Sequence, residues 1–102
     1  MTILRESLDK IGFEADALPP VTPGEVLREE FLAPLNLSAR ALAREINVSP
    51  NRITEIVNGE RAISAETAIL LGRRFNTSAR FWLNLQMARD LAQAQRAMYH
   101  AA

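Results

Sequence analysis

The sequence has no cysteine, a single histidine and few aromatic side chains, which make up 6% of its 102 residues. Without cysteine the chain can form no disulfide bond and no thiolate metal site, and we expect it to work in a reducing compartment such as the cytoplasm. The only histidine is His100, and no cluster of histidine and carboxylates accompanies it. The sequence therefore predicts no metal site, no cofactor and no enzymatic activity.

Long apolar runs are absent as well. No stretch approaches the roughly 20 residues that a membrane-spanning helix needs. Residues 2–20 contain acidic side chains in place of the apolar segment of a signal peptide. Strand patterns are also nearly absent, whereas Ala, Leu, Arg and Glu dominate. We therefore predict an all-α protein with no membrane contact and no small-molecule substrate, in which a 48% hydrophobic composition supplies one core.

The first 20 residues are predicted to form a separate segment. Apolar residues with helical spacing occur in it, but Gly12 interrupts the pattern and the pair Pro19-Pro20 favours extended backbone. We therefore divide the chain into an N-terminal arm and linker, residues 1–20, and a domain, residues 21–102. The arm is either a partly ordered tail or an element that docks on a partner.

Five helices are predicted from their start signals. Each begins after a hydroxyl side chain that can accept a hydrogen bond from the first helical turn. Two of them also have proline at the first helical position, where no backbone N–H is needed. The predicted caps are Thr22, Ser38, Ser49, Ser64 and Ser78. Pro34 is expected to end the first helix, and the fourth is expected to span residues 65–75.

Residues 35–59 are the most informative stretch, because they contain two short helices joined by a tight turn. Serines cap both helices, Pro50 occupies the first position of the second, and Asn58-Gly59 ends it. Two helices joined in this way form the helix-turn-helix unit, whose second helix enters the DNA major groove.

The second helix of this pair is predicted to have an apolar and a polar face. Ile53, Ile56 and Val57 form one inward stripe. At about 100° per residue, the remaining surface carries the side-chain types that contact DNA bases. These residues are Asn51, Arg52, Thr54, Glu55 and Asn58. A solvated helix could carry the same side chains, so the DNA interpretation depends on the capped pair around them.

The net charge is zero, but the charges are unevenly distributed. Residues 1–30 contain three basic and seven acidic groups, whereas residues 38–80 contain seven arginines and four glutamates. A positive segment around the helix pair is typical of nucleic-acid binding. The acidic segment could equally serve a basic protein partner.

The last predicted helix has two apolar faces. One is formed by Phe81, Leu85, Ala88 and Ala92, and the other lies nearly opposite. Either the helix is central to its own core, or the second face binds a partner. Because helix-turn-helix proteins commonly form twofold dimers, we predict a homodimer. The residues predicted at its interface are Trp82, Leu83, Met87, Leu91 and Met98; for Trp82 a place in the core is the alternative.

Three segments together resemble the HigA antitoxins of bacterial toxin–antitoxin pairs, which belong to the Xre/Cro-like helix-turn-helix group. These segments are residues 22–31 (TPGEVLREEF), the helix pair, and residues 81–86 (FWLNLQ). The resemblance implies a five-helix fold like that of lambda repressor. It also implies a cytoplasmic dimer that represses its own operon, lies on the nucleoid when bound to DNA, and neutralises a RelE-like (HigB-type) mRNA-cleaving toxin.

The resemblance implies DNA contacts at the start and on the exposed face of the second helix of the pair. We expect Arg52 and Asn51 to contact bases, and Thr54 and Glu55 to refine the choice of sequence. The residues expected to hold phosphates are Ser49, Asn58, Arg40 and Arg61. Glu55 departs from the basic or polar residue frequent in the family, and it could either contact a cytosine or orient Arg52 three residues away.

Two functional alternatives stay open at this stage. A solitary Xre-family regulator without a toxin partner would have the same motifs. Toxin inhibition would use a different surface, for which the acidic arm and the first helix of the domain are the candidates.

Overall fold

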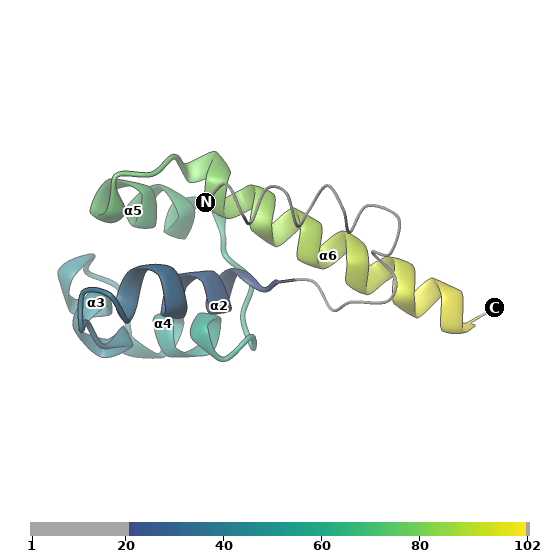
Figure 1. Cartoon of the computed structure of the whole chain (residues 1–102), viewed down its shortest axis with the longest axis horizontal. Coiled ribbons are helices and arrows are strands. Elements are labelled where there is room, and N and C mark those ends of the chain that lie inside the picture. The colour runs from purple at the N-terminus through teal and green to yellow at the C-terminus, as the bar shows by residue number, and fades with distance from the viewer. Residues whose placement is uncertain (1–20, 102) are drawn as a thin grey trace.

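The computed structural model describes residues 21–101, and this part of the chain is built from helices (Figure 1). The elements are α2 (Pro23–Val26), η1 (Leu27–Leu32), α3 (Ala39–Glu45), α4 (Pro50–Val57), α5 (Ala65–Phe75) and α6 (Ala79–Ala101). Because η1 continues α2 without a break, these elements are five helices, and the predicted all-α class is confirmed. The predicted arm and linker lie outside the described residues. Within the described range no helix is both long and apolar enough to span a bilayer.

Hydroxyl side chains cap four of the five helices, as predicted. Oγ1 of Thr22 accepts a hydrogen bond from the backbone N–H of Glu25 at 3.0 Å. Ser38, Ser64 and Ser78 accept equivalent bonds from the backbone N–H groups three residues further on, in the first turn of each helix. Each such cap stabilises a helix by about 0.5–2 kcal/mol. Ser49 is the exception: it occupies the N-cap position of α4, but its hydroxyl makes no capping bond.

The first helix widens partway along its length. The backbone N–H of Ala33 donates to the carbonyl of Arg28, five residues earlier, at 2.9 Å, which is the π-helical pattern. This pattern turns residues five apart toward the same side, and Leu27 and Leu32 are both buried. The apolar pattern of this segment follows the α-helical period, so it predicts a regular α-helix and does not reveal the π-helical turn.

The connections between helices use asparagine in the left-handed backbone region. Asn36, Asn47 and Asn76 have φ values of 50°, 60° and 58°. Asparagine tolerates this conformation better than other residues with a side chain, and it therefore allows the chain to reverse within a few residues. Asn76 is the C-cap of α5, where the sequence predicted the helix to end.

The core lies where the first half of α6 meets the other helices. Trp82 is 0% exposed, and its indole N–H donates to Oγ1 of Thr77 at 2.8 Å. The centroid of the Trp82 ring lies 5.1 Å from that of Phe31, in a tilted arrangement, and 5.1 Å from that of Phe81, in an edge-on arrangement. Figure 1 shows the rest of α6 extending away from the other helices. The first turns of α6 therefore fix this helix to the domain.

A glycine allows the first helix to approach α4 closely. A Cβ atom on Gly24 would lie 2.0 Å from the carbonyl oxygen of Ile56, a distance that no side chain can occupy. The contacting atom belongs to the backbone, so it cannot rotate away. Gly24 thus sets how close α2 lies to the second helix of the pair, a role that its sequence neighbours do not reveal.

Candidate nucleic-acid interface

The turn between α3 and α4 places the two helices in direct contact. Its sharp reversal occurs at Asn47, after which the backbone N–H of Val48 donates to the carbonyl of Ala43 at 2.9 Å. The other end of α4 stops as predicted. Gly59 has φ = 79°, and its N–H donates to the carbonyl of Ile56 at 3.0 Å. Backbone hydrogen bonds therefore close both the turn before α4 and the C-terminal end of α4, so its exposed face has a defined position.

The inward face of α4 is apolar, as predicted. Ile53 is 0% exposed and Ile56 is 1% exposed, and Val57 packs partly buried against the same core. Burying side chains of this size stabilises the fold by about 1.5–3 kcal/mol each. The predicted DNA-contacting residues of α4 all retain solvent access: Asn51 and Asn58 are exposed, and Arg52, Thr54 and Glu55 are half-exposed.

Thr54 is less available than its position suggests. Its hydroxyl donates back to its own helix, to the carbonyls of Pro50 at 3.1 Å and Asn51 at 3.2 Å. In this arrangement the hydroxyl proton is already used, and the oxygen lone pairs and the methyl group remain for a DNA base. Ser49 shows the opposite situation, because its hydroxyl makes no capping bond at the exposed start of α4.

Each of the two arginines at this surface is bound to a glutamate. Nη1 of Arg52 lies 3.1 Å from Oε1 of Glu66, in the first turn of α5. Nε of Arg61 lies 2.7 Å from Oε1 of Glu55. The suggestion that Glu55 orients Arg52 is therefore wrong, because Glu55 pairs with Arg61 across the end of α4. A tertiary contact from α5 supplies the partner of Arg52 instead.

Arg40 lies on the exposed side of α3, close to the start of that helix. Within the described residues it forms no ion pair, so its guanidinium is available to a phosphate. The site therefore combines one unpaired cation with two cations that are already held by carboxylates.

The second apolar face of α6 is exposed along most of its length. Met87, Leu91 and Met98 are 62%, 57% and 73% exposed, whereas Leu83 packs partly buried against the core. For Trp82 the predicted interface position is corrected: the ring is fully buried within its own chain and offers no atom to a partner. The core alternative holds for this residue.

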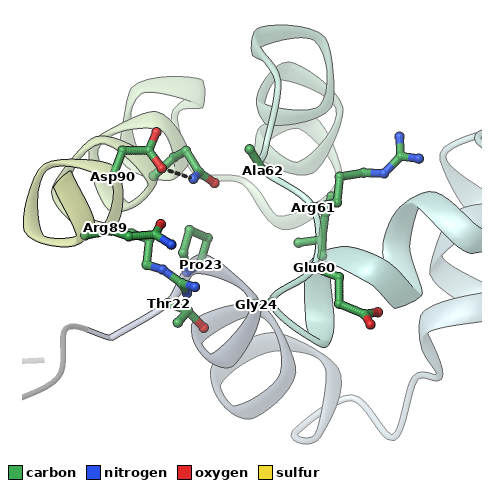
Figure 2. Close-up of a pocket in the computed structure, with 12 residues that line it drawn as sticks. Thr22, Pro23, Gly24, Glu60, Arg61, Ala62, Arg89 and Asp90 are labelled. Atoms are coloured by element: carbon green, nitrogen blue, oxygen red, sulfur yellow. Dashed lines mark hydrogen bonds between the residues drawn. The ribbon is translucent and has the colours of Figure 1, made fainter. Parts of the chain in front are cut away.

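A polar cleft of about 250 Å³ separates the start of α2, the loop after α4 and the middle of α6. Figure 2 shows Arg89 extending toward Thr22 at one wall, while the Arg61 side chain points away from the cleft. Gln86 also lines the cleft: its Oε1 accepts from the backbone N–H of Ile63 at 2.8 Å, and its Nε2 donates to Asp90 at 2.8 Å.

Gln86 is a structural residue, although by its sequence pattern alone it is only one of the polar residues between the apolar faces of the last helix. It ties α6 to the loop that leads from α4 to α5, and that loop carries Arg61. In the sequence, the importance of Gln86 is indicated only by its place in the segment FWLNLQ. Within the described part of the chain, no group of three histidine, cysteine, aspartate or glutamate side chains could hold a metal ion.

The sequence matches a known protein family and several known proteins. The helix-turn-helix family model matches residues 27–82. Virulence-associated protein I of Dichelobacter nodosus is 53% identical over 78 residues, which are 76% of this chain and 72% of that protein. Antitoxin HigA-1 of Vibrio cholerae is 39% identical over 72 residues, which are 71% of this chain and 68% of the antitoxin.

A solved structure extends the likeness to three dimensions. The antitoxin HigA of Pseudomonas aeruginosa, determined with the higBA promoter, superposes with a TM-score of 0.75 at 51% sequence identity. The match covers 76% of this chain and 85% of the antitoxin. Both the fold and a large part of the sequence are therefore shared with a protein whose structure contains promoter DNA.

Proposed function

This chain belongs to the HigA antitoxin family of helix-turn-helix proteins, and from this premise we propose that it is a sequence-specific DNA-binding antitoxin that represses its own operon. In this role α4 lies in the major groove, with Arg52 and Asn51 on base edges and Thr54 and Glu55 beside them. Ser49, Asn58, Arg40 and Arg61 then contact phosphates around the groove.

One observation carries the DNA-binding role: the buried stripe of α4 leaves every polar residue of the helix on its accessible side. Ile53 and Ile56 are fully buried, so the helix can present only the face that contains Asn51 and Arg52. The P. aeruginosa relative, with the same fold, is solved with promoter DNA. Both observations support α4 as the element that enters the groove.

Fluorescence anisotropy tests this proposal. The protein is titrated into a labelled duplex from the region immediately upstream of its own coding sequence, and into a scrambled duplex of equal length, at two salt concentrations. We expect tight, salt-sensitive binding to the upstream duplex and weak binding to the scrambled one. Equal weak binding to both duplexes would contradict repression of its own operon.

Arg52→Ala sharpens the same test. Loss of a guanine contact should weaken binding to the upstream duplex by about 1–3 kcal/mol and reduce its advantage over scrambled DNA. Arg96→Ala is the matched control, because it removes one positive charge from the exposed end of α6. An equal loss on both duplexes would instead identify Arg52 as a phosphate contact.

The apolar face of α6 supports a homodimer. Leu83, Met87, Leu91 and Met98 lie on one side of α6 at about 100° per residue, and a helix in water gains stability when such a side is covered. A twofold dimer would also present two copies of α4 to successive major grooves. We include this dimer in the proposed function, with α6 at its centre and Trp82 excluded from the interface.

Toxin neutralisation is the second part of the proposal and is supported by the family alone. The proposed partner is a RelE-like toxin of the HigB type, and the candidate surfaces are residues 1–18 and the exposed acidic side of α2 and η1. Glu25, Glu29 and Glu30 are exposed there. Deleting residues 1–18 and measuring toxin binding by calorimetry separates the two surfaces: unchanged affinity would leave α2 and η1 as the docking elements.

A further inference from the structure

The two arginines beside the groove-facing surface are each bound by one glutamate through part of the guanidinium. Glu66 holds Arg52 through Nη1, at 3.1 Å. Glu55 holds Arg61 through Nε, at 2.7 Å. A guanidinium has five N–H donors in a fixed planar fork, so in both cases other donors remain for a second acceptor.

The pair of Arg52 and Glu66 depends on the tertiary structure. The two residues are 14 positions apart and lie on different helices, α4 and α5, so packing of these helices brings them together. Arg52 is half-exposed and Glu66 is exposed, which places the pair at the edge of the α4 surface. An aspartate or glutamate in the first turn of a helix also interacts favourably with its macrodipole. That local effect accounts for an acidic residue at this position, but it does not require Arg52 as a partner.

Resting on the proposed function, we propose that Glu66 is a specificity-determining positioning residue for DNA recognition. On any DNA, a phosphate must compete with the Glu66 carboxylate for the Arg52 guanidinium, so the pair weakens sequence-independent binding. A guanine presents two acceptors that bind one edge of the fork, and that edge can be used while Nη1 stays with Glu66. The pair therefore favours a base contact over a phosphate contact.

Glu55 has the corresponding effect on Arg61 at the other end of α4. Because Glu55 binds Nε, both terminal nitrogens of Arg61 remain available to a phosphate while the ion pair holds the side chain in place. This assigns a role to Glu55, the acidic residue on the DNA-facing side of α4. Its negative charge restrains a phosphate-binding arginine.

The test compares Glu66→Gln with Glu60→Gln. Both substitutions remove one negative charge near α4, but within the described residues Glu60 makes no ion pair. Dissociation constants are measured by anisotropy on the upstream and scrambled duplexes over a series of salt concentrations. Urea unfolding of each variant shows whether the fold is retained.

We expect Glu66→Gln to lower the ratio of upstream to scrambled affinity by about two- to fivefold, the effect of one exposed ion pair. The affinity should rise mainly for the scrambled duplex. The salt dependence of that binding should steepen by about one released ion. Glu60→Gln should strengthen binding to both duplexes equally and leave the ratio unchanged.

A double-mutant cycle identifies Arg52 as the residue through which Glu66 acts. In an Arg52→Ala background, Glu66→Gln should change the ratio no more than Glu60→Gln does. Equal ratios for Glu66→Gln and Glu60→Gln in the otherwise wild-type protein would overturn the inference while leaving the proposed function intact. If the wild-type protein does not discriminate between the duplexes, the proposed function itself fails.

Discussion

The side chains of α4 and those of the second half of α6 differ in how far they find contacts within their own chain. In α4 the apolar residues are buried within the chain, and Arg52 and Glu55 are held by partners from outside the helix. In α6 every residue from 93 to 99 is exposed, including Met98, and Leu91 just before them is also exposed. A polar surface is stable in water, whereas a continuous apolar stripe is stabilised when it is covered. The α4 surface is therefore stable within one chain, whereas the exposed apolar side chains of α6 are the reason for proposing a homodimer.

The first prediction has the largest expected effect and tests which part of α6 packs in the core. Trp82→Ala should lower the free energy of unfolding by about 3–5 kcal/mol, because it removes a fully buried ring and leaves a cavity. Gln95→Ala, on the exposed half of the same helix, should stay within about 0.5 kcal/mol of the wild type. Urea unfolding measures both. A loss below about 1 kcal/mol for Trp82→Ala would contradict the central packing of this residue.

The second prediction tests how firmly α4 is fixed against the first helix. Gly24→Ala should cost about 1–3 kcal/mol or more, since the new Cβ would overlap the Ile56 carbonyl and force the helices apart. Gly59→Ala is the comparison: a Cβ there meets no atom within 4 Å, and only its positive φ opposes the change. Urea unfolding should show a larger loss for Gly24→Ala. The reverse order would show that backbone conformation, rather than close helix packing, dominates.

The third prediction tests the association through α6. Leu91→Glu should weaken the proposed homodimer at least tenfold, because a charge in an apolar interface is desolvated without a partner. Gln93→Glu adds the same charge to an exposed position on nearly the opposite side of the same helix, at about 100° per residue, and should leave the dimer unchanged. Sedimentation velocity over a range of protein concentrations measures the dissociation constants. Equal dimerisation of wild type and Leu91→Glu would exclude this face as the interface.

The smallest effect concerns the turn before α4. Asn47→Ala should cost about 1 kcal/mol, because alanine resists the left-handed conformation that this residue adopts. Asn47→Gly should remain within about 0.5 kcal/mol, because glycine accepts the conformation but has more freedom to lose on folding. Urea unfolding distinguishes the two substitutions. Equal losses would indicate that the asparagine side chain, rather than the backbone angle, stabilises the turn.

Local signals in the sequence predicted much of this fold. Thr22, Ser38, Ser64 and Ser78 cap helices as expected, because a cap depends on residues within one helical turn. The inward stripe of α4 was predictable for the same reason, since its periodicity is contained within eight residues. The widened first helix was not predictable in this way, because its hydrogen bonds depart from the period on which such patterns rely.

The sequence by itself determined the class of fold, the helix ends and the polar face of α4, all of which follow from residues a few positions apart. Only the tertiary structure decided that Trp82 lies in the core, that Gly24 touches α4, and that Glu66 holds Arg52. Each of these contacts joins residues from different helices. Their distances depend on how close-packed helices cross, which a one-dimensional pattern does not contain.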